Sequence, residues 1–156
     1  MDITLDDIDL QILELMQNNG RISNADLARE LSMAPSAVLE RVKKLEQKNV
    51  ITGYTAQINP MALQQKLLAF IFIKSTEGFG TNDKIVTALS KIPEVQEVHI
   101  VAGDDCFLAK IRTTDSATLM DILRNSLKKV PGIASTKTTI VLETVKEQQQ
   151  LVIPKN

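Results

Sequence analysis

The stretch SMAPSAVLERVKKLEQKNVI, residues 32–51, contains a predicted helix directly after a turn. Pro35 suits the first turn of this helix, because its missing N–H would have no helical partner there. Val38, Val42 and Leu45 recur at helical spacing and predict one buried seam. Four Lys or Arg residues between positions 41 and 48 lie on or beside the opposite side. The stretch therefore predicts a surface helix with a basic outer face.

The residues before this helix complete a helix-turn-helix pattern. Thr4 is predicted to cap a first helix, and Gly20 is predicted to end it in the left-handed conformation that glycine tolerates. Ser23 is predicted to cap a second, short helix. Residues 32–34 then leave a tight turn before Pro35, and two short helices joined in this way form a helix-turn-helix.

The outer face of the third helix suits the major groove of double-stranded DNA. Side chains near its start would meet base edges, and its cationic side chains would meet phosphates. The candidate DNA contacts are Ser36, Ala37, Glu40, Arg41, Lys43 and Lys44. A charged outer face is also the ordinary state of a surface helix, and helix-turn-helix patterns occur in proteins that bind no DNA.

The charge of the chain is distributed unevenly. The 156 residues carry a formal net charge of −1, so any attraction to nucleic acid must come from a local face. Residues 1–20 contain five acidic residues and no Lys or Arg, whereas residues 21–60 contain six basic and four acidic residues. The positive charge is therefore gathered near the predicted third helix.

The composition excludes several classes of function. No apolar run approaches the ~18 residues of a membrane span, and the acidic N-terminus does not resemble a secretory signal, so a cytoplasmic location is expected. The single Cys106 and the single His99 provide neither an intrachain disulfide nor a metal cluster. No third group is evident to orient His99 as a catalytic base. We expect no enzyme activity, no metal and no cofactor.

The second part of the chain contains a short repeated motif. KIPEV at residues 91–95 and KVPGI at residues 129–133 each stand between a helical and a β-rich stretch. The predicted elements are a strand at residues 67–75, a helix at 81–91, strands at 95–101 and 107–113, a helix at 116–129 and a strand at 134–142. This βαββαβ order predicts a ferredoxin-like (ACT-like) fold.

The predicted fold class is therefore α+β, with two domains. Residues 1–55 form the helix-turn-helix domain, residues 56–65 a linker and residues 66–156 the ferredoxin-like domain. Residues 67–73 are apolar on both faces of their strand, whereas two helices can cover only one face of a sheet. A sheet from a second copy is predicted to cover the other face. The alternative is that residues 146–156 fold back over it.

Two features of the second domain are candidates for ligand binding. The loop at residues 102–106 contains Gly103, and its exposed amides could hold a carboxylate, although an ordinary turn explains the same residues. Thr136 and Thr138 lie on one face of the last strand. Their hydroxyls could contact a ligand, but threonine is also simply a good strand former.

Several separated motifs, in order, resemble the leucine-responsive regulatory protein (Lrp/AsnC, or feast/famine) family. Residues 5–60 resemble its DNA-binding module and linker. LAFIFIKS at residues 68–75, IPEVQEVHIVAGDDCFLAKI at 92–111 and VPGIASTKTTIVLETVK at 130–146 resemble its effector-binding and assembly domain. The resemblance implies a sequence-specific prokaryotic transcription regulator that is associated with the nucleoid. It implies dimers joined through their sheets, often assembled as an octamer of four dimers, which would bind roughly palindromic sites.

The resemblance also implies an amino acid or related small molecule bound between dimers. Carried over by position, the effector contacts are Gly103, Asp104, Asp105, Cys106, Thr136 and Thr138. Cys106 stands where the family usually has an acid, and Glu40 stands where it often has Arg or Lys. The first departure keeps an alternative open, a ligand-independent architectural protein that wraps DNA. A regulatory module of an amino-acid enzyme is disfavoured by the helix-turn-helix.

Overall fold

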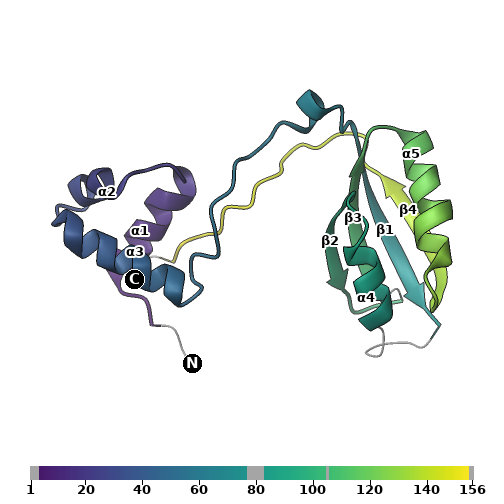
Figure 1. Ribbon diagram of the computed structural model, residues 1–156, viewed down its shortest axis with the longest axis horizontal. Helices are drawn as coiled ribbons and strands as arrows, with labels where there is room; N and C mark the ends of the chain where they lie inside the picture. Colours follow the sequence, from purple (N-terminus) through teal and green to yellow (C-terminus); the bar gives the residue numbers. More distant parts are fainter. Residues whose placement is uncertain (1–3, 77–82, 105, 155–156) are drawn as a thin grey trace. The chain divides into compact units, whose positions relative to one another are not determined.

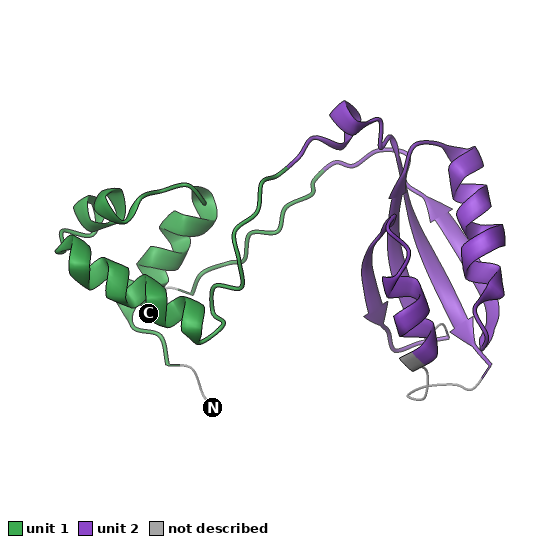
Figure 2. Ribbon diagram, viewed as in Figure 1, with its two compact units in different colours: residues 1–57, 146–156 green, residues 58–145 purple. Residues whose placement is uncertain are grey.

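The computed structural model describes residues 4–76, 83–104 and 106–154 (Figure 1). The chain divides into two compact units, one of residues 1–57 with 146–156 and one of residues 58–145 (Figure 2). The first boundary falls inside the predicted linker. The second differs from the predicted domain of residues 66–156, because the C-terminal segment belongs to the first unit.

Three helices form the first unit: α1 (Asp7–Asn18), α2 (Asn24–Glu30) and α3 (Pro35–Gln47). Pro35 occupies the first turn of α3, and the tight turn before it contains Ser32 in the left-handed conformation, with φ of 52°. The predicted seam is confirmed, since Val38, Val42 and Leu45 are all buried. The rest of this core is Ile12, Leu27 and Ala28.

The caps of α1 differ from the prediction. Asp6, and not Thr4, is the N-cap: its carboxylate accepts from the Asp9 N–H at 2.9 Å, and the Asp9 carboxylate accepts from the Asp6 N–H at 3.3 Å. This reciprocal capping box satisfies two amides that a lone threonine hydroxyl could not. The helix ends at Asn18, close to the predicted stop. Its C-cap is Asn19 in an extended conformation, and Gly20 does not adopt the predicted left-handed conformation. Ser23 caps α2 as predicted.

The C-terminal segment is attached to the end of α1. The Gln17 side chain donates to the Leu151 carbonyl at 2.8 Å and accepts from the Leu151 N–H at 3.0 Å. Gln150 Nε2 donates to the Gln17 carbonyl and to Asn18 Oδ1, both at 3.2 Å. Carbonyls in the last helical turn lack intrahelical partners, so Gln150 helps to cap α1. These bonds attach the C-terminal segment to the first unit.

The second unit has the predicted βαββαβ order. Its antiparallel sheet runs β2-β3-β1-β4, with β1 at Leu67–Ser75, β2 at Val95–Ile100, β3 at Phe107–Thr113 and β4 at Ile133–Ile140. The two helices are α4 (Asp83–Ser90) and α5 (Ser116–Asp121), and a short 3₁₀ turn, Pro60–Leu63, precedes β1. The start of the predicted helix at residues 81–82 lies outside the described residues. The helix that begins as α5 continues as a π-helical turn, Ile122–Ser126, and a 3₁₀ turn, Leu127–Lys129.

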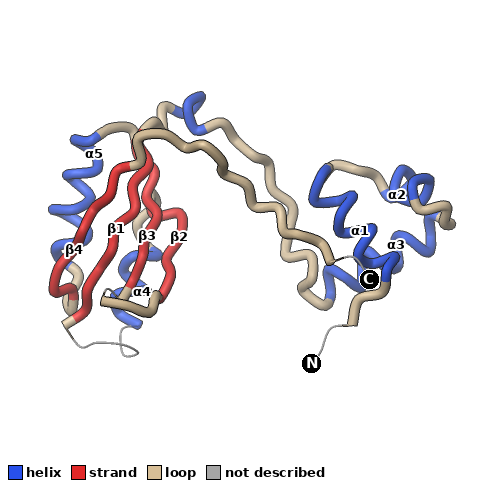
Figure 3. Tube along the Cα trace, turned by 180° about the vertical axis from the view of Figure 1, so that it is seen from behind, coloured by secondary structure: helices blue, strands red, loops and turns tan. Residues whose placement is uncertain are grey.

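Both helices lie on one face of the sheet, and the view from behind shows the strands without a helix in front of them (Figure 3). On the helix side, Ala69, Ile71 and Ile73 are completely buried. On the other side, Phe70 and Phe72 are only half-buried. The Lys137 ammonium lies 5.1 Å from the centroid of the Phe72 ring, so a basic side chain shields part of this open face.

Truncation of a core side chain tests this packing. Ile71→Ala should lower the free energy of unfolding by about 2–5 kcal/mol, because it removes buried methyl groups and leaves a cavity. Lys74→Ala, at an exposed position of the same strand, is the matched control and should change it by less than about 0.5 kcal/mol. Chemical denaturation at one protomer concentration measures both. Equal effects of the two changes would contradict the assignment of the strand's faces.

Candidate nucleic-acid and ligand interfaces

The outer face of α3 is exposed as the helical periodicity predicts. Ser36, Glu40, Lys43 and Lys44 are exposed, and Ala37 is half-buried. Because the seam holds the opposite side of α3 in the core, these side chains are presented to the solvent together. The helix thus offers a mixed surface of one hydroxyl, one carboxylate and two ammonium groups.

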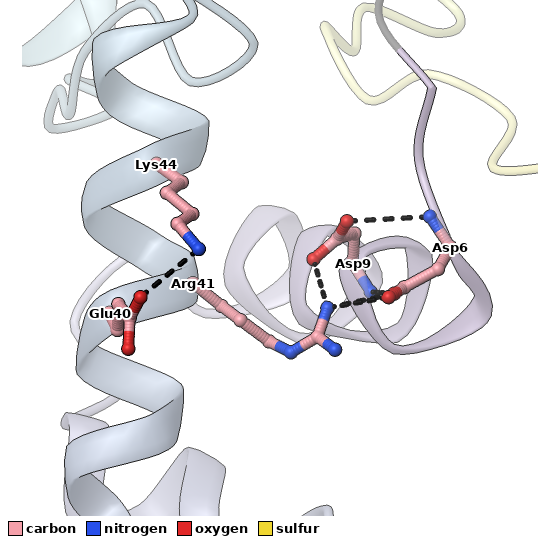
Figure 4. A network of polar contacts seen from close by, with 5 residues as sticks. All are labelled: Asp6, Asp9, Glu40, Arg41 and Lys44. Atoms are coloured by element: carbon pink, nitrogen blue, oxygen red, sulfur yellow. Dashed lines mark hydrogen bonds and ion pairs between the residues drawn. The ribbon is translucent and has the colours of Figure 1, made fainter.

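Arg41 differs from the other cations of α3, because its guanidinium contacts α1 (Figure 4). Its Nη1 lies 2.7 Å from Asp6 Oδ2 and 2.8 Å from Asp9 Oδ1. The side chain is 30% exposed, and that of Asp9 is 17% exposed. The acidic residues in the first turn of α1 could have indicated this contact from the sequence. The helix dipole also favours acids at that position, however, so their presence alone did not predict a bond to α3.

The two lysines of the outer face are less constrained. Lys44 Nζ lies 3.0 Å from Glu40 Oε1, one turn away, with both side chains more than 60% exposed. An exposed pair of this kind is worth ~0.3–0.5 kcal/mol, so Lys44 can exchange Glu40 for another anion at little cost. No acidic side chain in the described part of the chain pairs with Lys43. A hollow of about 460 Å³ beside these groups is lined by both acidic and basic side chains, from Asp6 and Asp9 to Lys44 and Lys48.

The contacts around Asp6 set its protonation. The hydrogen bond from the Asp9 N–H, followed by that from Arg41, lowers the pKa of Asp6 below its usual value. The same carboxylates raise the pKa of Arg41. Since the pKa of Asp6 is lower in the folded state, its stabilising contribution is complete above the unfolded pKa and is lost as the pH falls through the folded value.

The loop predicted to hold an effector lies between β2 and β3. Gly103 has φ of 141°, a conformation that residues with side chains rarely adopt, and a Cβ added there would meet no atom within 4 Å. Asp104 is exposed, and Asp105 lies outside the described residues. Cys106 is half-buried against the core, and its N–H donates to the Ile73 carbonyl at 2.9 Å.

Within one chain the predicted threonines lie on the second strand from the end of this loop. Thr136 and Thr138, on β4, pair with Ile73 and Ile71 of β1, and Cys106 donates its N–H to the Ile73 carbonyl from the other side of β1. Two strand spacings, about 10 Å, therefore separate Cys106 from Thr136. Thr136 is exposed and Thr138 half-buried.

A polar cluster on the open face of the sheet was not singled out from the sequence. Glu97 lies 3.1 Å from Lys110 Nζ and 3.1 Å from His99 Nε2. The hydrogen bond from His99, followed by that from Lys110, lowers the pKa of Glu97. Cross-strand charge periodicity in β2 and β3 could have found this cluster, once their register was known. His99 is thus engaged by a carboxylate on its own strand.

Within residues 4–76, 83–104 and 106–154, no three His, Cys, Asp or Glu side chains gather as metal ligands would. None of the helices among these residues has the length and apolar character to span a bilayer.

The fold and its surfaces define a two-part DNA-binding regulator, in which a helix-turn-helix unit is joined to a ligand-binding unit. Residues 5–52 match the family described as winged helix-turn-helix DNA-binding, and residues 68–151 match the Lrp/AsnC ligand binding domain. The chain belongs to the Lrp/AsnC family of transcription regulators, as the resemblance implied. It is a DNA-binding regulator and not an enzyme.

Individual relatives agree with this assignment. The leucine-responsive regulatory protein of Escherichia coli K12 is 40% identical over 150 residues, covering 96% of this chain and 92% of the relative. A Neisseria meningitidis transcriptional regulator in complex with L-methionine is 27% identical, with a TM-score of 0.90 over 96% of this chain and 97% of that one. The feast or famine regulatory protein of Mycobacterium tuberculosis, complexed with L-methionine, is 31% identical, with a TM-score of 0.88 over 97% of this chain and 100% of that one.

Titration of Asp6 tests the contacts of Arg41. Arg41→Ala should raise the pKa of Asp6, because the guanidinium no longer favours the carboxylate, but should leave it below the usual value, because the Asp9 N–H remains. Carboxyl ¹³C chemical shifts recorded against pH measure both values. Glu14→Gln, an exposed change on the same helix, is the control and should leave Asp6 unchanged. An unaltered Asp6 titration in Arg41→Ala would contradict the bridge.

Proposed function

We propose that this regulator reads DNA through the outer face of α3 and that an amino acid modulates its binding. The single observation that carries the DNA interface is the exposed face opposite the buried seam of Val38, Val42 and Leu45. Docking in the major groove needs a helix whose inner side is fixed and whose outer side is free. With DNA as its target, the protein would act in the cytoplasm, in association with the nucleoid.

The proposed contacts divide into two kinds. Ser36, Ala37 and Glu40 stand near the start of α3, where a recognition helix meets base edges. A glutamate accepts a hydrogen bond from cytosine N4, so Glu40 would favour a C·G pair at its position. Lys43 and Lys44 would contact phosphates, which position the helix without reading sequence. Arg41 also belongs to the candidate surface, but its guanidinium is already engaged by Asp6 and Asp9.

Self-association through the open face of the sheet would present two copies of α3. Its half-buried Phe70 and Phe72 favour a second sheet as the cover. A symmetric dimer binds half-sites about 10 base pairs or a multiple apart, so the preferred sites would be roughly palindromic. Family resemblance extends this proposal to an octamer of four dimers.

The proposed effector site lies between copies of the chain. Gly103, Asp104, Asp105 and Cys106 of one copy would meet Thr136 and Thr138 of another, as the family resemblance implies. The similar regulators from Neisseria meningitidis and Mycobacterium tuberculosis hold L-methionine, so free amino acids are the first candidates. Cys106 supplies no carboxylate to an amino group, and the neighbouring Asp105 would have to do so. No cofactor is required.

Substitution of the outer lysines tests the DNA interface. Lys43→Ala with Lys44→Ala should weaken binding to all sequences and reduce the log–log salt slope by about 0.9 for each phosphate that the variant no longer neutralises. Fluorescence anisotropy at several salt concentrations measures both quantities. A double change of exposed lysines in the second unit, Lys91→Ala with Lys128→Ala, is the charge-matched control. Unchanged affinity and slope in the Lys43/Lys44 variant would remove α3 from the interface.

The role of Glu40 is tested by sequence preference. Glu40→Ala should relax the preference at one base pair in each half-site, by about 1–3 kcal/mol, while other positions keep theirs. Selection of bound DNA from a random pool measures this change. Identical preferred sequences for the native protein and Glu40→Ala would contradict a base-reading role.

Ligand binding is tested by thermal unfolding with each free amino acid at millimolar concentration. A ligand at 100 times its Kd stabilises the folded protein by ~2.7 kcal/mol, which is visible as a higher Tm. Gly103→Ala should abolish this shift, because φ of 141° strains any residue with a Cβ. Gly20→Ala is the matched control, since the nearest atom to its added Cβ is 4.0 Å away. If no amino acid shifts the Tm or DNA affinity of the native protein, the architectural alternative takes precedence.

A further inference from the structure

We infer that Arg41 is a positioning residue, which holds the start of α1 against the recognition helix and does not contact phosphate. This inference rests on the proposed DNA interface of α3 and assigns one of its six candidate residues a different role. The observation that carries it is the bridge of one guanidinium nitrogen to two carboxylates (Figure 4).

The geometry of the bridge is tight. Nη1 of Arg41 donates to both oxygens of Asp6, at 2.9 and 2.7 Å, and to Asp9 Oδ1 at 2.8 Å. Charge-assisted hydrogen bonds of this length are stronger than those between neutral groups. The Lys44–Glu40 pair on the same helix makes one contact at 3.0 Å between two well-exposed side chains. Arg41 is thus held in place, whereas Lys44 is readily released.

The two partners of Arg41 are the residues that define the start of α1. Asp6 is the N-cap and Asp9 completes the capping box, so their carboxylates are already fixed by backbone N–H groups. Apolar packing between α1 and α3 is non-directional. The hydrogen bonds from Arg41 of α3 to the fixed cap of α1 are directional. They therefore restrict the orientation of α3 relative to α1, which apolar packing alone does not.

A phosphate contact by Arg41 would be unfavourable. An approaching phosphate would meet two carboxylates and one guanidinium, a local excess of negative charge. To bind it, Arg41 would have to leave Asp9, whose side chain is only 17% exposed, without its charged partner. Lys43, which pairs with no acidic side chain among the described residues, offers a phosphate contact without this penalty.

A double-mutant cycle with Arg41→Ala and Asp9→Asn separates the two roles. If Arg41 positions α3, Arg41→Ala weakens DNA binding on the order of 3- to 30-fold in the native background, and this weakening becomes smaller in the Asp9→Asn background, where only the contacts with Asp6 remain. The salt slope stays unchanged, since no phosphate contact is removed. If Arg41 contacts phosphate, the weakening is undiminished in the Asp9→Asn background and the slope falls by about 0.9, which overturns the inference.

Arg41→Lys provides a second test that depends less on folding. A lysine replaces a phosphate contact as a point charge, but its shorter side chain does not carry the ammonium to the position that Nη1 occupies between the two fixed carboxylates. Arg41→Lys should therefore lose DNA affinity as Arg41→Ala does. Native affinity in Arg41→Lys would overturn the inference.

Glu14→Gln, which removes one exposed acid from α1, controls for the charge change of Asp9→Asn. The lysine substitutions described above distinguish failure of this inference from failure of the DNA interface. Reduced affinity on changing Lys43 and Lys44, together with an undiminished effect of Arg41→Ala in the Asp9→Asn background, keeps α3 at the DNA and rejects only the positioning role.

Discussion

The burial of one side of α3 is the constraint on which the DNA-binding unit depends. Val38, Val42 and Leu45 pack with Ile12 and Leu27 in a small core, and this contact decides which side of α3 faces the solvent. Apolar burial fixes the face but not the direction of the helix axis. The bridge from Arg41 to the cap of α1 supplies a directional contact at the same junction. Core and bridge together present Ser36, Glu40 and Lys43.

The two faces of the sheet in the second unit differ in their surroundings. One face of its sheet is sealed by helices over Ala69, Ile71 and Ile73, and the other retains half-buried aromatic rings beside the Glu97, His99 and Lys110 cluster. Cys106 and Thr136, two of the candidate effector groups, lie two strand spacings apart within one chain, about 10 Å. Assembly and ligand binding are linked in the proposed mechanism, because the proposed effector site lies between copies of the chain.

Hydrophobic periodicity predicted much of the architecture. The seam of α3 and the strands Leu67–Ser75 and Phe107–Thr113 follow from spacing alone, because burial imposes a period on each element. Polar contacts were predicted less well. The sequence placed the α1 cap at Thr4 instead of Asp6, and it could not show that Asp6 and Asp9 meet Arg41, which is 32 positions or more away. The attachment of Leu151 to Gln17 likewise depends on tertiary contacts with no local signature.

The central claim, that the outer face of α3 meets DNA, is tested most directly by lysine footprinting of the full chain. Acetylation of each lysine is followed by mass spectrometry, with and without saturating DNA. If the outer face of α3 meets DNA, Lys43 and Lys44 become protected in the complex, while the exposed Lys91 and Lys128 of the second unit react as they do in the free protein. Equal reactivity of Lys43 and Lys44 in the free and bound states would contradict it.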